Sequence, residues 1–430
     1  MIKKNINVGI IGLGHIGGRL YKEIISKKSD IELKTGSKVN IVAISAKNYK
    51  KKRSFKFKKN LFYKNPILIS KNPKIDIVFE LIGLSDGISK KIVETALKNK
   101  KHVITANKAV IAKHGDYLSL LAEKNNVNLE FEAAVGGGIP VLRTIKDGLS
   151  TNKISKVVGI LNGTCNYILS EMETSKDSFK TVLKKAQSLG YAEPGDPKYD
   201  LNGLDSLAKV RILSAIAFNK KISRNKCLMD GIENIEIKDI EMASKLNFRI
   251  KLLGITEIIN NKLFERVHPC LVKKNNYIAN INGVMNAIIL EGKPVGQTIL
   301  QGEGAGPGPT SSALMSDLLS ILRGNIKYSF GSPYKKRKKT SYYDNNKYSN
   351  SFYLRIDVKD KPGVMSSIAK NFAKYNISIK NLIQNPDKKN NKASIIIVTH
   401  KNIEKNYKNL ILNLYKNKFV IKKPTFIRIE

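Results

Sequence analysis

The chain has 430 residues, 42% hydrophobic and 26% charged, so it is long enough for several folded domains and too apolar to be disordered throughout. A formal net charge of +41 would suit a protein that binds nucleic acid or a membrane surface. The lysines are spread through every segment, however, and no basic and aromatic stacking module interrupts them. No run approaches the roughly 18 apolar residues of a membrane helix. Neither nucleic acid nor a membrane is an expected partner.

Three cysteines, Cys165, Cys227 and Cys270, lie far apart without CxxC spacing, which fits a reducing compartment. The lysine-rich opening resembles a signal peptide, but glycines interrupt its apolar run and no small-residue cleavage site follows. We therefore expect a cytoplasmic protein.

The first third of the chain predicts a parallel sheet, because short apolar runs alternate with helical patterns from residue 6 to about 141. Apolar residues at 92, 93, 96 and 97 predict an amphipathic crossover helix over residues 90–100. Residues 49–60 are expected to form an exposed basic loop. The strands are expected in NVGIIGLG, VNIVAISA, KIDIVFELIG, KHVITANK and VNLEFEAAV.

The rest of the chain predicts two further domains. Residues 142–331 mix helix, hairpin and strand patterns, which indicates an α+β domain. Residues 332–350 lack apolar periodicity and carry a five-residue basic run, so we expect a linker that forms a solvated hinge. The pattern of residues 351–430 is βαββαβ, typical of a small ferredoxin-like unit with a strand edge open for pairing. Residues 1–141 complete the expected α/β architecture as a Rossmann domain.

A glycine motif follows the first predicted strand and opens a helix. Gly12, Gly14 and Gly17 form GxGxxG, whose glycines permit the tight turn, the approach of a pyrophosphate and close packing of helix on strand. The second strand ends in Ser45 and Lys47, with no acid to bind a ribose 2′-hydroxyl. A cation there favours NADP over NAD.

Two further segments bring lysines to places where chemistry occurs. Thr105 and Lys108 follow a strand at its carboxyl end, the edge where open α/β sheets bind ligands. Asp205 and Lys209 are four residues apart on a helix whose Lys209 face otherwise reads as buried. An exposed pair would contribute only about 0.3 to 0.5 kcal/mol. A buried pair could instead exchange a proton with a substrate oxygen. Upstream of the pair, Glu193, Asp196 and Asp200 could orient the amine of an amino-acid substrate.

Alternatives remain for two of these motifs. The carboxylates near Asp205 could bind a divalent metal, although no histidine lies near them in sequence. The glycine-rich run 301–317 precedes a helix that Thr310 or Ser311 is expected to cap. That run is either the far wall of the dinucleotide cleft or the phosphate loop of a small-molecule kinase. The kinase interpretation is less consistent with the sequence, because the run lacks a GK[ST] ending.

Taken together, several segments resemble the signatures of homoserine dehydrogenase. They are GLGHIGG, ITANKAV, EFEAAVGGGIPV, LNGTCNYIL, LGYAEPGDPKYDLNGLDSLAKV and QGEGAGPGPTSSA, and KDKPGVMSSIA resembles the start of an ACT domain. The resemblance implies a monofunctional, NAD(P)-dependent enzyme, without an aspartokinase, that interconverts L-homoserine and L-aspartate 4-semialdehyde for threonine and methionine biosynthesis. It also implies a homodimer or homotetramer, with residues 142–331 serving catalysis and dimerisation.

The same resemblance implies roles for individual residues. Lys209, Lys108 and Asp205 would be catalytic, and Glu193, Asp200 and Gly190 would bind substrate. Glu132, with the backbone of Val135, Gly137 and Ile139, would hold a monovalent cation, sodium by expectation. The implied cofactor contacts are Gly12, Leu13, Gly14, His15, Ile16, Gly17, Ser45, Lys47, Thr105, Lys108, Gly302 and Gly304.

For the C-terminal unit, the resemblance implies an amino-acid effector, threonine, bound near Asp360 to Val364. Because all the chemical signatures end before Ser332, we expect that residues 351–430 can be removed without abolishing catalysis. The rival to an enzyme is an amino-acid-sensing, nucleic-acid-binding regulator built from the basic surface and this tail.

Overall fold

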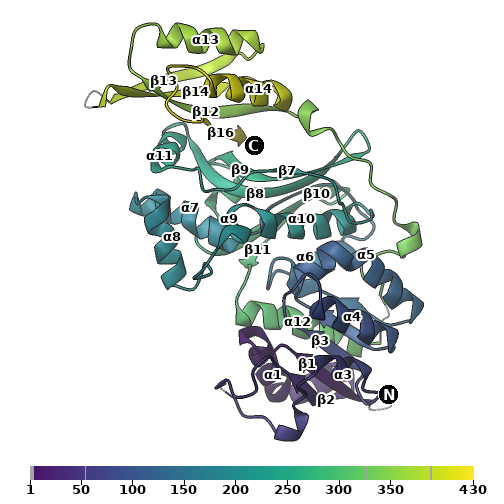
Figure 1. The fold of residues 1–430 in the computed structure, drawn as a ribbon. Helices are drawn as coiled ribbons and strands as arrows, with labels where there is room; N and C mark the ends of the chain where they lie inside the picture. Colours follow the sequence, from purple (N-terminus) through teal and green to yellow (C-terminus); the bar gives the residue numbers. More distant parts are fainter. Residues whose placement is uncertain (1–3, 54, 325–326, 388–389) are drawn as a thin grey trace.

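The structure is a computed structural model and describes residues 4–53, 55–324, 327–387 and 390–430. Figure 1 shows three layers along the molecule: a parallel-sheet domain at one end, a second sheet in the middle and a small α/β unit at the other end. Within the described part of the chain, no helix combines the length and apolar character needed to cross a membrane.

The first sheet confirms the expected Rossmann domain. Its five parallel strands run in the order β2-β1-β3-β4-β5, so β1 lies between β2 and β3 and its carboxyl end marks the point where the strand order reverses. Ligands of open α/β sheets bind at that point. The strands are β1 (Lys4–Ile11), β2 (Ser37–Ser45), β3 (Ile77–Glu80), β4 (His102–Thr105) and β5 (Leu129–Glu130).

The expected crossover helix is α4 (Ile88–Lys98), which buries Ile92, Val93, Ala96 and Leu97 on one face. Its neighbours are α1 (His15–Ser26), α2 (Lys28–Thr35), η1 (Lys59–Leu61), α3 (Pro66–Lys71) and α5 (Lys108–Lys124).

A late segment of the chain returns to this domain. Helix α12 (Pro307–Leu322) packs beside α1, and its Leu314 and Leu318 join the core formed around β1. The prediction that Thr310 or Ser311 caps this helix is wrong. The helix already begins at Pro307, where a fixed φ suits the first turn, and both hydroxyl residues are buried inside it.

The second sheet joins the middle domain to the C-terminal unit. Its main path runs β11-β10-β6-β8-β9-β16-β12-β14-β13, with β7 on β9 and β15 on β12. The strands of the middle domain are β6 (Lys153–Ile160), β7 (Leu228–Met229), β8 (Phe248–Ile259), β9 (Lys262–Lys273), β10 (Met285–Lys293) and β11 (Gly296–Glu303). Its helical segments are η2 (Glu132–Ala134), α6 (Val141–Arg143), η3 (Thr144–Gly148), α7 (Gly163–Ser175), α8 (Phe179–Ser188), α9 (Lys198–Leu201), α10 (Leu204–Ala217), α11 (Ile237–Lys245) and η4 (Tyr277–Asn280).

The C-terminal unit confirms the βαββαβ pattern, and its edge pairs as expected. Strand β16 (Thr425–Ile429) lies parallel to β9 of the middle domain, with Arg428 opposite Cys270 and Ile429 opposite Leu271. The two domains therefore share one continuous sheet. The remaining elements are β12 (Ser349–Lys359), α13 (Val364–Lys374), β13 (Ile379–Asp387), β14 (Lys392–Thr399), β15 (Asn402–Ile403) and α14 (Glu404–Tyr415).

Residues 332–350, with η5 (Tyr334–Lys336) and η6 (Asn345–Lys347), connect the domains, and the four lysines of the predicted basic run are exposed as expected. The segment is not a free hinge, however, because it is attached to the domains on both sides. Arg337 is only 2% exposed and pairs with Asp116 at 2.9 Å. Further along, the backbone of Leu263 exchanges hydrogen bonds with Ser341 and Tyr343. The segment lacks apolar periodicity because it lies along two domains instead of forming its own core.

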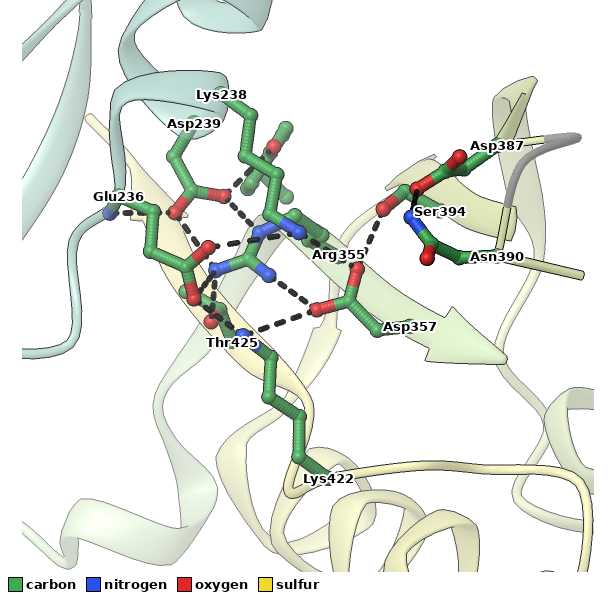
Figure 2. Close-up of polar contacts among 11 residues, drawn as sticks. Glu236, Lys238, Asp239, Arg355, Asp357, Asp387, Asn390, Ser394, Lys422 and Thr425 are labelled. Carbon is green, nitrogen blue, oxygen red and sulfur yellow. Dashed lines mark hydrogen bonds and ion pairs between the residues drawn. The ribbon is translucent and has the colours of Figure 1, made fainter. Parts of the chain in front are cut away.

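A buried ionic cluster fastens α11 to the C-terminal unit (Figure 2). Nε and Nη2 of Arg355 on β12 donate to the two oxygens of Asp239 on α11, at 2.6 and 3.0 Å, and neither side chain is exposed. Nη1 of Arg355 donates to Asp357, while Lys238 and Lys422 reach the rim of the cluster. The bidentate pair fixes the orientation of the C-terminal unit on the middle domain.

Candidate active site

Two adjoining clefts open at the carboxyl end of the Rossmann sheet. One, of about 1000 Å³, is lined by the glycine loop and the end of β2, including Gly12, Gly14, Lys47 and Arg53. The other, of about 1080 Å³, lies between the start of α5 and helix α10. It is lined by Asn107, Lys108, Glu193, Tyr199, Ala208 and Arg211, among others. Leu84 lines both clefts, so they form one continuous groove.

Asp205 joins two lysines beside the second cleft, and one of them, Lys108, lines that cleft. Its Oδ2 accepts a hydrogen bond from Lys209 at 2.8 Å, and its Oδ1 pairs with Lys108 at 2.9 Å. Lys209 also donates to the backbone oxygen of Leu161 at 2.6 Å, and among the described residues its third N–H donor has no acceptor. The Lys209 side chain is 10% exposed and that of Lys108 is 35% exposed. The buried lysine on α10 thus has both a carboxylate partner and a donor to spare.

The electrostatics keep Asp205 and Lys108 charged. Burial alone would raise the pKa of Asp205, but the Lys209 and Lys108 ammonium groups outweigh it and hold that pKa well below its usual range. Burial likewise opposes the charge on Lys108, yet Asp205 raises the Lys108 pKa above its ordinary value. Carboxylate and ammonium therefore stay ionised near neutral pH, because each stabilises the other in a site with little water.

The predicted substrate residues lie at different depths. Oδ1 of Asp200, on α9, accepts from Asn162 at 2.8 Å, and burial together with the charge of Asp205 raises the Asp200 pKa. Glu193 is exposed on the rim of the cleft. Gly190 ends α8 with φ of 75° and is not among the residues lining the clefts. The structure thus brings Asp200 close to the two lysines, with Glu193 at the entrance and Gly190 outside.

The glycine loop has the close backbone approaches that its motif predicts. A Cβ on Gly12, whose φ is 102°, would lie 2.6 Å from the oxygen of Leu81, and one on Gly17 would lie 2.0 Å from the oxygen of Gly12. Leu13, Gly14 and His15 line a smaller hollow of about 410 Å³ beside the groove. Ile16 packs against the core of the Rossmann domain.

Several predicted cofactor residues have other partners. Ser45 lines the first cleft, but its hydroxyl donates to the backbone of Tyr63 at 2.8 Å. The hydroxyl of Thr105 is buried and donates to Glu80 at 2.8 Å. Gly302 and Gly304 line neither cleft. Gly304 lies against Asn286 and Gly137, and Pro307 is the residue of that loop that faces the hollow beside Gly14.

Sequence reasoning missed Arg53 and Asn162. Residues 49–53 and 55–60 are mostly exposed, as expected, but Phe55 stacks on Tyr21 of α1 at 4.7 Å and folds the loop back. Arg53 consequently lines both the first cleft and the smaller hollow, and its Nε donates to the oxygen of Leu13 at 3.4 Å. The signal was a basic run beside a strand end that lacks an acid.

The predicted cation residues form a turn with suitable oxygen donors. The two oxygens of Glu132 accept from the backbone N–H groups of Leu142 and Arg143, both at 2.8 Å, and retain further lone pairs. Among the described residues, no donor contacts the carbonyl oxygens of Val135 and Gly137, whereas that of Ile139 accepts from Val141. Carboxylate and carbonyl oxygens are hard ligands that suit a small hard cation.

A Rossmann domain with a glycine loop, joined to a cleft holding two lysines on one carboxylate, defines a nicotinamide-dependent oxidoreductase. Residues 12–132 match the homoserine dehydrogenase NAD binding domain, residues 140–319 match homoserine dehydrogenase and residues 352–414 match the ACT domain. The chain belongs to the homoserine dehydrogenase family and interconverts L-homoserine and L-aspartate 4-semialdehyde with NAD(P). This assignment decides against the kinase and regulator alternatives.

Individual relatives agree over the full length. The homoserine dehydrogenase of Neisseria gonorrhoeae is 37% identical over 99% of both chains, and that of Helicobacter pylori is 36% identical over 100% of both. The solved structure of a homoserine dehydrogenase from Thiobacillus denitrificans is 36% identical, with a TM-score of 0.91 over 100% of this chain and 99% of that one.

Proposed function

We propose that Lys209 is the proton donor and acceptor at the substrate C4 oxygen, with Lys108 as the second lysine beside that oxygen. The observation that carries the proposal is the single carboxylate, Asp205, that holds both ammonium groups beside the cleft. When bound, the nicotinamide would supply a hydride to C4 of the substrate or accept one from it. Lys209 moves the accompanying proton, so no covalent intermediate is required.

Substrate binding follows from the charges around the lysines. The ammonium group of homoserine or aspartate semialdehyde would meet the carboxylates of Glu193, which lines the cleft, and of Asp200, which Asn162 holds beside Asp205. Asp205 would hold the ammonium groups of Lys108 and Lys209 in place rather than contact the substrate. The free N–H of Lys209 supports its role, because a donor already saturated by the protein could not serve the substrate.

We also propose that NADP is the preferred cofactor, with Arg53 and Lys47 facing the ribose 2′-phosphate. Both residues line the cleft beside the glycine loop, where the sequence has no acid to select the 2′-hydroxyl of NAD. A charge-assisted hydrogen bond contributes about 1.5 to 3 kcal/mol.

Arg53→Ala is therefore expected to lower kcat/KM for NADPH roughly 10- to 100-fold while changing that for NADH little. Lys47→Asp should shift the NADPH-to-NADH ratio in the same direction. The matched control is Lys58→Ala, since Lys58 belongs to the same basic loop and is exposed outside both clefts. Steady-state kinetics with both cofactors measures the ratio. Equal losses for NADPH and NADH in Arg53→Ala would assign Arg53 to folding of the loop instead.

A monovalent cation, sodium by our proposal, would be held by Glu132 and the backbone oxygens of Val135, Gly137 and Ile139. The positive φ angles of Gly136 and Gly137, 76° and 56°, turn this backbone sharply. A bound cation would stiffen a turn that packs against Gly304 of the loop preceding α12.

The ACT unit, in our proposal, binds threonine near Asp360 to Val364, and the enzyme works in the cytoplasm as a homodimer or homotetramer. The expected result is that millimolar L-threonine lowers the rate and gives a binding isotherm in calorimetry, with a coupling of about 1 to 3 kcal/mol between the two sites. L-serine, which lacks the methyl group, serves as the matched ligand control. An enzyme indifferent to threonine in both assays would leave the unit a purely structural part of the shared sheet.

A further inference from the structure

Asn162 occupies the turn between β6 and α7 and lies next to the carboxylate that binds the active-site lysines. It is the N-cap of α7, and its Oδ1 accepts from the backbone N–H of Cys165 at 2.8 Å. The preceding residue, Leu161, supplies the carbonyl oxygen that Lys209 binds. Asn162 is only 5% exposed, so its amide group is oriented by the protein and not by water.

The amide nitrogen of Asn162 connects the two carboxylates of the site. Its Nδ2 donates to Oδ1 of Asp200 at 2.8 Å and to Oδ2 of Asp205 at 3.0 Å. That same Oδ2 of Asp205 accepts from Lys209. A primary amide has two N–H donors in one plane, and here each is directed to a different carboxylate. With Oδ1 as the cap and Nδ2 as the double donor, Asn162 uses both ends of its side chain.

We propose that Asn162 is a positioning residue for the dehydrogenase reaction, setting the orientation of Asp200 toward substrate and, through Asp205, that of both lysines. The inference rests on the proposed roles of these four residues. Asp200 and Asp205 come from different helices, α9 and α10, and a half-buried and a buried carboxylate repel each other unless a donor lies between them. Asn162 is that donor, and it is neutral, so it does not compete with the lysines for charge.

The proposal has a pH signature. The groups that face Asp200 are Asp205, Lys108 and Lys209, the phenol of its neighbour Tyr199 and the thiol of Cys165, which donates to the Asp200 backbone oxygen. Burial and the charge of Asp205 raise the Asp200 pKa, and the Asn162 hydrogen bond opposes that rise. Loss of this bond should raise the pKa further. Since an ionised Asp200 binds the substrate ammonium, activity should then begin to fall at a higher pH as the solution is acidified.

The test replaces Asn162 in two ways that keep a helix cap. Asn162→Asp retains the cap oxygen and loses both donors, and Asn162→Ser is neutral, caps α7 and is too short to reach both carboxylates. Both variants are expected to lower kcat/KM for homoserine about 10- to 100-fold, the usual range for a residue that acts through another. The acidic limb of the kcat/KM profile should move to higher pH. Asn276→Asp is the matched control, because Asn276 also caps a turn, through Ile278, but is exposed and touches no carboxylate.

A double-mutant cycle separates positioning from general folding. In an Asp205→Asn background, Asn162→Ser should cost much less than in the wild-type enzyme, because the group through which Asn162 acts is already altered. A cost that is equal in the two backgrounds, or an acidic limb that stays in place in Asn162→Ser, overturns the proposal. If Lys209→Ala were fully active, the proposed function itself would fail. A wild-type profile for Asn162→Ser beside an inactive Lys209→Ala would reject the positioning role alone.

Discussion

Lys209→Ala should lower kcat by roughly 10² to 10⁴, the usual contribution of a general acid-base group, while the dissociation constant for NADPH changes little. The ammonium group of Lys209 contacts Leu161 and Asp205 and is not part of the glycine loop. Alanine therefore removes the proton carrier and leaves the cofactor-binding loop unchanged. Rapid-mixing measurement of homoserine oxidation and fluorescence titration of NADPH would separate the two quantities.

The control for this variant is Lys113→Ala. Lys113 lines the second cleft, as Lys108 does, but it is exposed and pairs with Asp86 at 2.7 Å instead of with Asp205. Its removal should leave kcat nearly unchanged. Because Lys209→Ala also leaves Asp205 with a single lysine partner, the unfolding midpoint of each variant must be measured alongside. Wild-type turnover by a folded Lys209→Ala enzyme would remove Lys209 from the chemistry.

Sequence could foresee those parts of the site that local geometry determines. Asp205 and Lys209 are one helical turn apart, so their contact follows from the helix alone. Gly12 and Gly17 are close because a tight turn joins a strand to a helix, and the motif carries that geometry with it. Such contacts need no knowledge of the rest of the fold.

Contacts between distant segments were not predictable in the same way. The joining of Lys108 to Asp205 depends on how the Rossmann domain docks on α10, which no periodicity encodes. Asn162 reads from sequence as an ordinary helix cap, and only the tertiary structure reveals its second function as a donor to two carboxylates. Arg337 sits in a basic run that is typical of a solvated loop, yet its guanidinium is buried against Asp116.

The prediction that the C-terminal unit can be removed without abolishing catalysis likewise depended only on the order of the motifs along the sequence. The catalytic signatures do precede it, but the structure makes β16 a neighbour of β9 in one sheet. The last residue, Glu430, also pairs with the buried Arg266 of β9. Removing residues 351–430 would expose the backbone edge of β9 and strip Arg266 of one of its carboxylates. An uncovered strand edge of this kind favours aggregation.

Deletion of residues 351–430 is therefore expected to give a poorly soluble or unfolded chain, and Arg355→Ala should be the milder version of the same defect. Asp239 is fully buried, and without Arg355 it would remain in the domain junction with its principal cationic partner gone. Breaking a buried pair from one side costs about 3 to 5 kcal/mol. Denaturant unfolding of the full-length chain would measure that loss for Arg355→Ala.

Lys422→Ala is the control, since Lys422 is 48% exposed at the rim of the same cluster and an exposed pair contributes about 1 kcal/mol or less. A truncated chain that keeps the wild-type unfolding midpoint and full activity would show that the shared sheet is dispensable, and would return the C-terminal unit to a purely regulatory role.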